Sequence, residues 1–206
     1  AKPLGIVLAQ HCEVTALTKG AVMHEGSCCS RLGLPGWPAI AEDLMVFRDI
    51  ELARLTGARL HVLHLSTARS VDLVRAAKQD GLPVTAEACP HHFTLTDEQL
   101  GGYDPVFKVN PPLRTRADID AIKAGLADGT IDAIATDHAP HHLDEKSVEF
   151  DRAPFGLVGF ETCVPLTLDR LVHPGLITLT RFVELLSVNP ARILNVPGGS
   201  LTPGQP

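Results

Sequence analysis

The sequence has no excess of positive charge and no long apolar segment, and each absence excludes a class of protein. Its 18 basic and 24 acidic residues give a formal net charge of −6. No basic stripe is available to displace the counterions of a nucleic acid, so nucleic acid is not expected as a partner. No apolar run approaches the roughly 20 residues that span a bilayer, and no signal peptide opens the chain. No membrane association is therefore expected.

Cysteine pairs with metal-binding or redox spacing are also missing. The five cysteines are odd in number, include the adjacent Cys28 and Cys29, and contain no CxxC. This pattern favours free thiols in a reducing compartment, and the cytoplasm is the expected location. The sequence also lacks P-loop, GxGxxG, GxSxG and HExxH motifs, which excludes the commonest nucleotide-binding, esterase and zincin classes.

Apolar runs and helical patterns alternate along the chain, which predicts an α/β fold with a parallel sheet. The expected strands are Gly5–Ala9, Arg59–Leu65, Pro83–Cys89 and Ile131–Ala135. The expected helices are 39–56, 70–80, 118–128, 165–171, 180–187 and a short one from Asn189, and residues 14–38 are expected to form an irregular insertion. Four βα units make half of a (β/α)₈ barrel, and 206 residues are fewer than the about 250 of a complete one.

Histidine is abundant, and its positions are the strongest functional signal. Most of the ten histidines follow apolar runs. His11 follows the first expected strand, His64 ends the second, His91 and His92 follow the third, and Asp137 follows the fourth. Side chains at the carboxyl ends of barrel strands converge on one pocket. Two imidazoles and a carboxylate there predict a divalent metal site, with zinc favoured, and Asp137 is also a candidate general base.

Other readings of these residues remain open. A lone Asp-His pair before a proline more often caps a turn in solvent, and His91 and His92 are expected to be structural. His61 lies three positions before His64, so it is expected to face the helices or the core rather than the barrel axis. His138 and His142 are expected to support the site or to face solvent. Cys12 and Cys89 are expected to be core thiols.

Several longer motifs resemble those of bacterial dihydroorotases in the amidohydrolase superfamily, and they run from end to end of the chain. The motifs are Gln10-His11-Cys12-Glu13, His61-Val62-Leu63-His64-Leu65-Ser66-Thr67, Glu87-Ala88-Cys89-Pro90-His91-His92, Lys108-Val109-Asn110-Pro111-Pro112-Leu113-Arg114, Ile134-Ala135-Thr136-Asp137-His138-Ala139-Pro140-His141 and Ala153-Pro154-Phe155-Gly156. The fourth and fifth motifs favour a dihydroorotase over the similar hydantoinases and allantoinases.

The resemblance implies a zinc-dependent cyclic amide hydrolase that interconverts L-dihydroorotate and N-carbamoyl-L-aspartate in pyrimidine biosynthesis. It implies two zinc ions in the intact site, with His11 and His64 on one and Asp137 on the other. Asp137 would also move the proton from the attacking hydroxide to the leaving nitrogen. The substrate would be held by Asn110, His141 and the backbone of Phe155 and Gly156.

Two departures from the family pattern affect this assignment. Val14 stands where the family usually has an aspartate. The His-x-His-x-Arg motif of the first barrel strand and the bridging carboxyl ligand of the fourth are absent. Residues 1–206 are therefore expected to be a partial amidohydrolase barrel domain, with strands 5–8 and their helices but without the N-terminal strands or the closing sandwich segment. This segment alone is expected to be inactive.

Two alternatives come from different functional classes. One is another cyclic amidohydrolase, of the hydantoinase or allantoinase type. The other is a non-catalytic dihydroorotase-like subunit that scaffolds aspartate transcarbamoylase, against which the presence of His11, His64 and Asp137 argues. Aspartate transcarbamoylase and a second copy of the chain are the protein partners that the resemblance admits.

Overall fold

A computed structural model of the protein describes residues 1–204 and contains a parallel sheet. Its strands are β1 (Leu8–Gln10), β4 (Leu60–Val62), β5 (Val84–Ala88) and β6 (Ala133–Ile134), adjacent in the order β1-β4-β5-β6. All three pairings are parallel, with Leu8 opposite Leu60 and Leu60 opposite Val84. The predicted α/β class and the four strand positions are confirmed, although each strand is shorter than expected.

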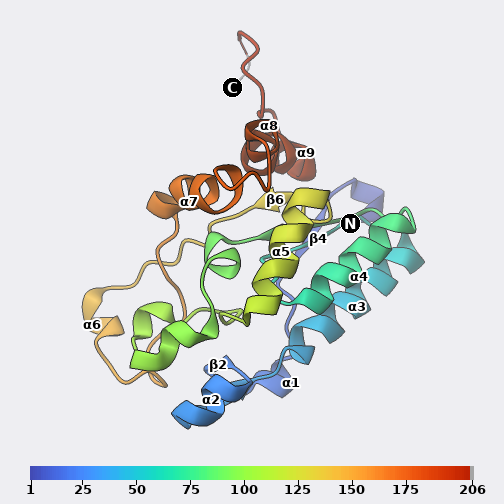
Figure 1. The fold of residues 1–206 in the computed structure, drawn as a ribbon. Coiled ribbons are helices and arrows are strands. Elements are labelled where there is room, and N and C mark those ends of the chain that lie inside the picture. The colour runs from blue at the N-terminus through green and yellow to red at the C-terminus, as the bar shows by residue number, and fades with distance from the viewer. Residues whose placement is uncertain (205–206) are drawn as a thin grey trace.

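Three helices pack side by side against one face of this sheet (Figure 1). They are α3 (Ile40–Thr56), α4 (Ala68–Gln79) and α5 (Arg116–Asp128). The Thr67 hydroxyl accepts a hydrogen bond from the Ser70 amide and so caps α4, while Thr115 and Asp118 form a capping box at α5. Local capping therefore sets the helix starts close to the predicted positions.

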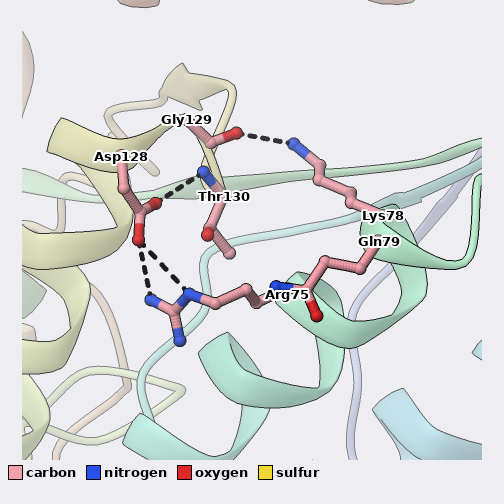
Figure 2. A pocket seen from close by; sticks show the side chains of 6 residues that line it. All are labelled: Arg75, Lys78, Gln79, Asp128, Gly129 and Thr130. Atoms are coloured by element: carbon pink, nitrogen blue, oxygen red, sulfur yellow. Dashed lines mark hydrogen bonds and ion pairs between the residues drawn. The ribbon is translucent and has the colours of Figure 1, made fainter.

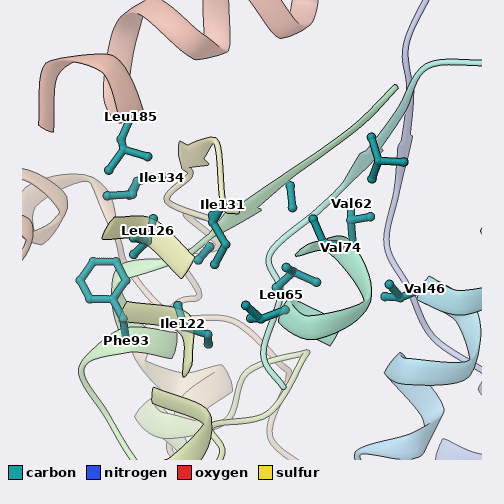
Figure 3. Close-up of a cluster of buried hydrophobic side chains, with 14 of the residues drawn as sticks. Val46, Val62, Leu65, Val74, Phe93, Ile122, Leu126, Ile131, Ile134 and Leu185 are labelled. Atoms are coloured by element: carbon teal, nitrogen blue, oxygen red, sulfur yellow. The ribbon is translucent and has the colours of Figure 1, made fainter. Parts of the chain in front are cut away.

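The hydrophobic core lies between the sheet and these helices (Figure 3). The sheet contributes alternate strand residues, namely Leu60, Val62, Val84, Ala86 and Ala88. Because side chains alternate along a strand, His61, Thr85 and Glu87 lie on the opposite face, where His61 hydrogen-bonds to both of the others, at 2.8 and 3.0 Å. His61 is buried, as expected, but its expected helix-facing orientation was wrong.

The insertion after β1 is more regular than predicted. It contains α1 (Thr15–Thr18), α2 (Ser27–Leu32) and a parallel pair of short strands, β2 (Met23–His24) and β3 (Gly36–Trp37). Its apolar side chains join residues from the middle of the chain in a second cluster, made of Val22, Met23, Cys28, Cys29, Leu100, Val109, Leu113 and Phe150. Burial against these distant residues, rather than local periodicity, orders the insertion.

Short helical elements complete the chain. The 3₁₀ helices are η1 (Lys2–Leu4), η2 (Pro90–Phe93), η3 (Asp97–Gly102) and η4 (Pro105–Phe107). The C-terminal region contains α6 (Leu143–Lys146), α7 (Phe160–Thr167), α8 (Leu179–Val183) and α9 (Asn189–Leu194), with π-helical turns at Leu168–Val172 and Glu184–Val188. Within residues 1–204, no helix has the length and hydrophobicity needed to cross a membrane.

One predicted strand is not buried as expected. Within the expected strand Gly5–Ala9, Ile6 and Leu8 are about half exposed. β1 pairs with β4 on one side and lies at the edge of the sheet. A strand is fully buried only when neighbours cover both its edges and both its faces, so the apolar composition alone overestimated the burial.

Candidate functional site

Two of the predicted metal ligands meet at the carboxyl ends of neighbouring strands. The His11 Nδ1 atom lies 3.1 Å from the His64 Nε2 atom. His64 is buried and has a φ of 29°, so the chain leaves strand geometry just after β4. Asp137, just after β6, also has a positive φ, of 46°. Backbones of this kind are uncommon outside glycine and are often found at functional sites.

Glu13 orients His11, a role that the sequence analysis did not assign. A carboxylate oxygen of Glu13 accepts hydrogen bonds from His11 Nε2 at 3.0 Å and from the Asn110 side-chain amide at 3.3 Å, and the Thr18 hydroxyl donates to the other oxygen. Burial raises the pKa of Glu13, but the three hydrogen bonds outweigh it and hold the pKa below its ordinary value. The ionised carboxylate therefore keeps the proton of His11 on Nε2 and leaves Nδ1 facing His64.

This arrangement fits a bound cation. Two imidazole nitrogens on one tetrahedral zinc ion lie about 3.3 Å apart, given zinc–nitrogen bonds of about 2.0–2.1 Å. The observed 3.1 Å is close to that separation. Metal-bound histidines commonly donate their second N–H to a carboxylate, as His11 does to Glu13. Burial lowers the pKa of His64, and His11 lowers it further. The nearby Asp137 carboxylate opposes this lowering.

The predicted substrate residues near Asp137 form one connected loop structure. His141 Nε2 lies 2.8 Å from the Phe155 carbonyl oxygen, and the Gly156 amide donates to the Lys108 carbonyl at 2.9 Å. A Cβ atom on Gly156 would lie 2.8 Å from the Ala139 carbonyl oxygen, and the φ of Gly156 is +132°. Glycine is therefore required where the chain passes closely over the end of β6.

A pocket of about 430 Å³ lies beside these residues. It is lined by Glu13, Thr15, Thr18, Lys19, Gly20, Ala21, Val22, Trp37, Lys108, Asn110, Asp151 and Phe155. The Lys108 ammonium lies 4.6 Å from the centre of the Phe155 ring and donates to the Asp151 carbonyl at 3.0 Å, while burial lowers its pKa. The volume suits a small ligand. Thr15, Thr18 and Trp37 of the insertion form part of one wall of this pocket.

A second pocket, of about 390 Å³, lies where α4 and α5 end, just before the chain enters β5 and β6 (Figure 2). Its charged groups bond to one another: Arg75 donates to Asp128 at 3.1 and 3.2 Å, and Lys78 donates to the Gly129 carbonyl at 2.9 Å and to Asp132 at 2.7 Å. These contacts link α4 to α5, which is a structural role.

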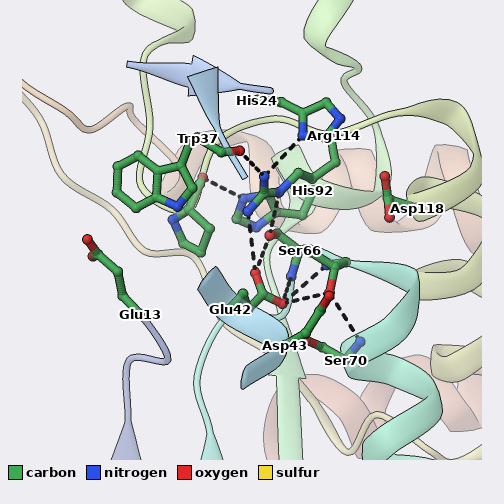
Figure 4. A network of polar contacts seen from close by, with 12 residues as sticks. Glu13, His24, Trp37, Glu42, Asp43, Ser66, Ser70, His92, Arg114 and Asp118 are labelled. Carbon is green, nitrogen blue, oxygen red and sulfur yellow. Dashed lines mark hydrogen bonds and ion pairs between the residues drawn. The ribbon is translucent and has the colours of Figure 1, made fainter. Parts of the chain in front are cut away.

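Buried carboxylates and a buried arginine hold the segment after His64 (Figure 4). Glu42 accepts from the amides of Ser66 and Thr67, at 3.0 and 3.2 Å, and from the Ser66 hydroxyl. Arg114 donates to the same hydroxyl at 3.0 Å and to the Trp37 carbonyl at 3.0 Å. This polar cluster therefore fixes the His64 turn to α3, to the insertion and to the Asn110–Arg114 segment.

His24, which faces Arg114, should make stability depend on pH. Its Nδ1 atom lies 3.1 Å from Arg114. Burial lowers the pKa of His24 to about 4, and Arg114 adds to this effect while Asp118 opposes it. The unfolded chain takes up this proton near pH 6.5 and the folded chain near pH 4, so the stabilisation is complete above about pH 6.5 and is lost as the pH falls toward about 4.

The expected result is that His24→Gln loses less stability than the wild type on acidification. The difference should reach about 3 kcal/mol between about pH 7 and pH 4, because one pKa unit corresponds to about 1.4 kcal/mol. Urea unfolding of both proteins at the two pH values, with chelator present, measures it. Equal losses in the two proteins would show that His24 is not responsible.

The remaining strand-end histidines have different surroundings. His138 Nδ1 accepts from the amides of Gly159 and Phe160, at 3.0 and 3.2 Å, and so holds the start of α7, while His142 is largely exposed. The exposure of His142 agrees with the solvent-facing role expected. His91 and His92 are buried, and burial lowers the pKa of His91 to about 3 and that of His92 well below its ordinary value.

Comparison with known proteins agrees with this geometry. Residues 48–206 match the family described as "Amidohydrolase family", and residues 1–70 match "Dihydro-orotase-like". The dihydroorotase of Pelotomaculum thermopropionicum is 57% identical over 201 residues, covering 98% of this chain and 47% of that protein. The dihydroorotase of Acetivibrio thermocellus is 50% identical over 200 residues, covering 97% of this chain and 47% of that protein. The chain thus spans about half the length of these relatives.

Solved structures show the same fold. An L-hydantoinase (dihydropyrimidinase) from Arthrobacter aurescens superposes with a TM-score of 0.85 at 28% identity, covering 98% of this chain and 47% of that one. A D-hydantoinase from a Bacillus species gives 0.83 at 24% identity, with coverage of 98% and 47%. The parallel α/β architecture, the convergent strand-end histidines and the match to more than half of its residues together show that this chain belongs to the amidohydrolase family.

Proposed function

We propose that this chain forms part of a zinc-dependent dihydroorotase, which interconverts L-dihydroorotate and N-carbamoyl-L-aspartate in pyrimidine biosynthesis. The observation that carries the proposal is the 3.1 Å approach of His11 to His64, close to Asp137 and beside a pocket that Asn110 lines. The dihydroorotase name of relatives at 50–57% identity supports this substrate over that of a hydantoinase.

His11, His64 and Asp137 would hold metal, as the separation of the two rings and the Glu13 contact support. Zinc there would polarise the amide carbonyl and lower the pKa of the attacking water. We assign residues 1–206 to strands 5–8 of the barrel with their helices. The His-x-His pair and the bridging carboxyl ligand of a two-zinc site would then come from outside these residues.

Asp137 would accept the proton of the attacking water and deliver it to the leaving nitrogen, which is general base and then general acid catalysis. Glu13 would keep His11 in the ligating tautomer. The Oδ1 atom of Asn110 is buried and has no hydrogen-bond partner among the described residues, so it is available to a substrate N–H group. His141 and the backbone of Phe155 and Gly156 would complete the substrate site.

The decisive assay compares cyclic amides on the full-length protein. Hydrolysis of L-dihydroorotate with a much higher kcat/KM than that of hydantoin or allantoin supports the proposal. The reverse order would assign a hydantoinase-type or allantoinase-type enzyme. A protein inactive on all three that binds aspartate transcarbamoylase would be the scaffold. Sedimentation with and without aspartate transcarbamoylase tests whether the protein forms a homodimer or a complex with that partner, and cell fractionation tests a cytoplasmic location.

Two variants of the full-length protein should weaken substrate binding and leave metal binding unchanged. Asn110→Ala and His141→Ala remove side chains that face the pocket or its loop without ligating metal in this assignment. Each should raise KM about tenfold or more, since an unmatched polar group in a binding site costs about 1–3 kcal/mol. Elemental analysis should show unchanged zinc. Loss of zinc in either variant would contradict the assignment of that residue to substrate.

A further inference from the structure

Three potential metal ligands that do not include His11, His64 or Asp137 lie together after β5. Cys89 follows β5, and His91 and His92 belong to η2. One donor atom from each of the three side chains lies within 4.8 Å of the other two. The exposed fractions of the residues are 0%, 4% and 2%. A sulfur and two imidazole nitrogens form a donor set that zinc and cobalt accept in proteins.

The two imidazoles carry nitrogens that the protein leaves unsatisfied. His91 Nε2 and His92 Nδ1 are buried and have no hydrogen-bond partner within residues 1–204. Burying a polar atom without a partner typically costs about 1–3 kcal/mol. Within residues 1–204 the protein supplies no partner for these two atoms, and their residues form one cluster with the Cys89 thiol. A ligand between them would satisfy both.

His92 is already held in the tautomer that a metal requires. Its Nε2 atom lies 2.9 Å from the Pro111 carbonyl oxygen. Because a carbonyl only accepts, Nε2 carries the proton and the neutral ring has its lone pair on Nδ1, the nitrogen left without a partner among the described residues. Donation of the second N–H to a backbone carbonyl is the usual support for a metal-bound histidine.

We propose that Cys89, His91 and His92 bind one thiophilic divalent cation, such as zinc or cobalt, at a site separate from the His11, His64 and Asp137 site. Cys89 would bind as the thiolate, with its proton released to solvent, while the two imidazoles donate lone pairs and need lose no proton. The donors would close to about 3.3–3.6 Å from one another, as tetrahedral bonds of about 2.0–2.3 Å require.

Electrostatics and access both favour a cation at this position. The carboxylates of Asp137 and Glu87 place negative potential at the Cys89 sulfur, which opposes a bare thiolate but favours a cation bound to it. A pocket of about 310 Å³ between η2 and α7 reaches His91 and offers an entry path. Through the His92–Pro111 hydrogen bond, the bound ion would fix the segment that presents Asn110.

Cobalt titration of the metal-free full-length protein under reducing conditions tests the proposal directly. A thiolate bound to Co²⁺ gives a near-ultraviolet charge-transfer absorption, which the nitrogen and oxygen ligands of the other site cannot give. We expect this absorption to saturate at one equivalent, to disappear on addition of zinc and to be absent in Cys89→Ser. It should persist in Cys28→Ser, which alters another buried thiol, and in the double variant His11→Ala/His64→Ala.

His91→Gln keeps the sulfur and should weaken Co²⁺ binding, read from the same absorption, by about tenfold or more. This variant decides the matter if Cys89→Ser proves unfolded by circular dichroism. Absence of the absorption in the wild type, its persistence in Cys89→Ser, its loss in Cys28→Ser or unchanged affinity in His91→Gln would each overturn the proposal. Because the readout is sulfur-specific, these results do not depend on whether the protein is a dihydroorotase.

Discussion

Asp137→Asn in the full-length protein is expected to lower kcat by about 10²–10⁴-fold in both reaction directions while most of the zinc remains bound. The amide oxygen of asparagine can replace a carboxylate oxygen as a ligand. The amide neither accepts nor releases a proton near neutral pH, so it cannot move the proton between the attacking water and the leaving nitrogen. Steady-state kinetics and elemental analysis of the same preparation measure the two effects separately.

Asp144→Asn is the matched control for this variant. Asp144 lies in α6, on the same connection after β6, and its side chain is 91% exposed. Its replacement should leave kcat unchanged. If Asp137→Asn retains more than about a tenth of the wild-type kcat, a proton-transfer role of the stated size is excluded. If it instead loses its zinc, Asp137 acts chiefly as a ligand.

Arg114→Met is expected to destabilise the protein by about 3–5 kcal/mol, the usual cost of removing one partner from a buried ion pair. Arg114 is 2% exposed, and its guanidinium lies 3.9 Å from the buried Glu42 carboxylate. Without it, Glu42 loses its buried counter-charge, and the Ser66 hydroxyl and Trp37 carbonyl lose a donor. Urea unfolding at neutral pH measures the change.

Two further variants test whether the destabilisation of Arg114→Met comes from the loss of its buried ion pair with Glu42. Arg54→Met removes an arginine that is 44% exposed and paired at the surface, and it should destabilise the protein much less than Arg114→Met does. The double variant Glu42→Gln/Arg114→Met removes both buried charges and should be less destabilised than the sum of its single variants. Strict additivity of the two single effects would show that the charges of Glu42 and Arg114 are not coupled.

Local sequence signals determined the elements of the fold and the place of the site. Helical periodicity, capping residues and the glycines at 57 and 129 located α3, α4 and α5 to within a few residues. Apolar runs located the strands of the sheet. The carboxyl ends of parallel strands lie at the same end of the sheet. The residues that follow these strands, His11, His64 and Asp137, could therefore be assigned to a common site before any contact was known.

Tertiary structure decided the features that depend on contacts between distant residues. His11 and His64 are 53 positions apart, and their ring separation follows from strand register. The strand β4 ends at Val62, so His61 lies within the strand and His64 lies beyond it, and the sequence did not show this boundary. The regular structure of the insertion depended on burial against Leu100, Val109 and Leu113. Glu13 and Arg114 gained roles only through partners that folding brings near. Periodicity and capping are local properties, whereas burial and hydrogen bonding are completed by packing, and packing is set by the whole chain.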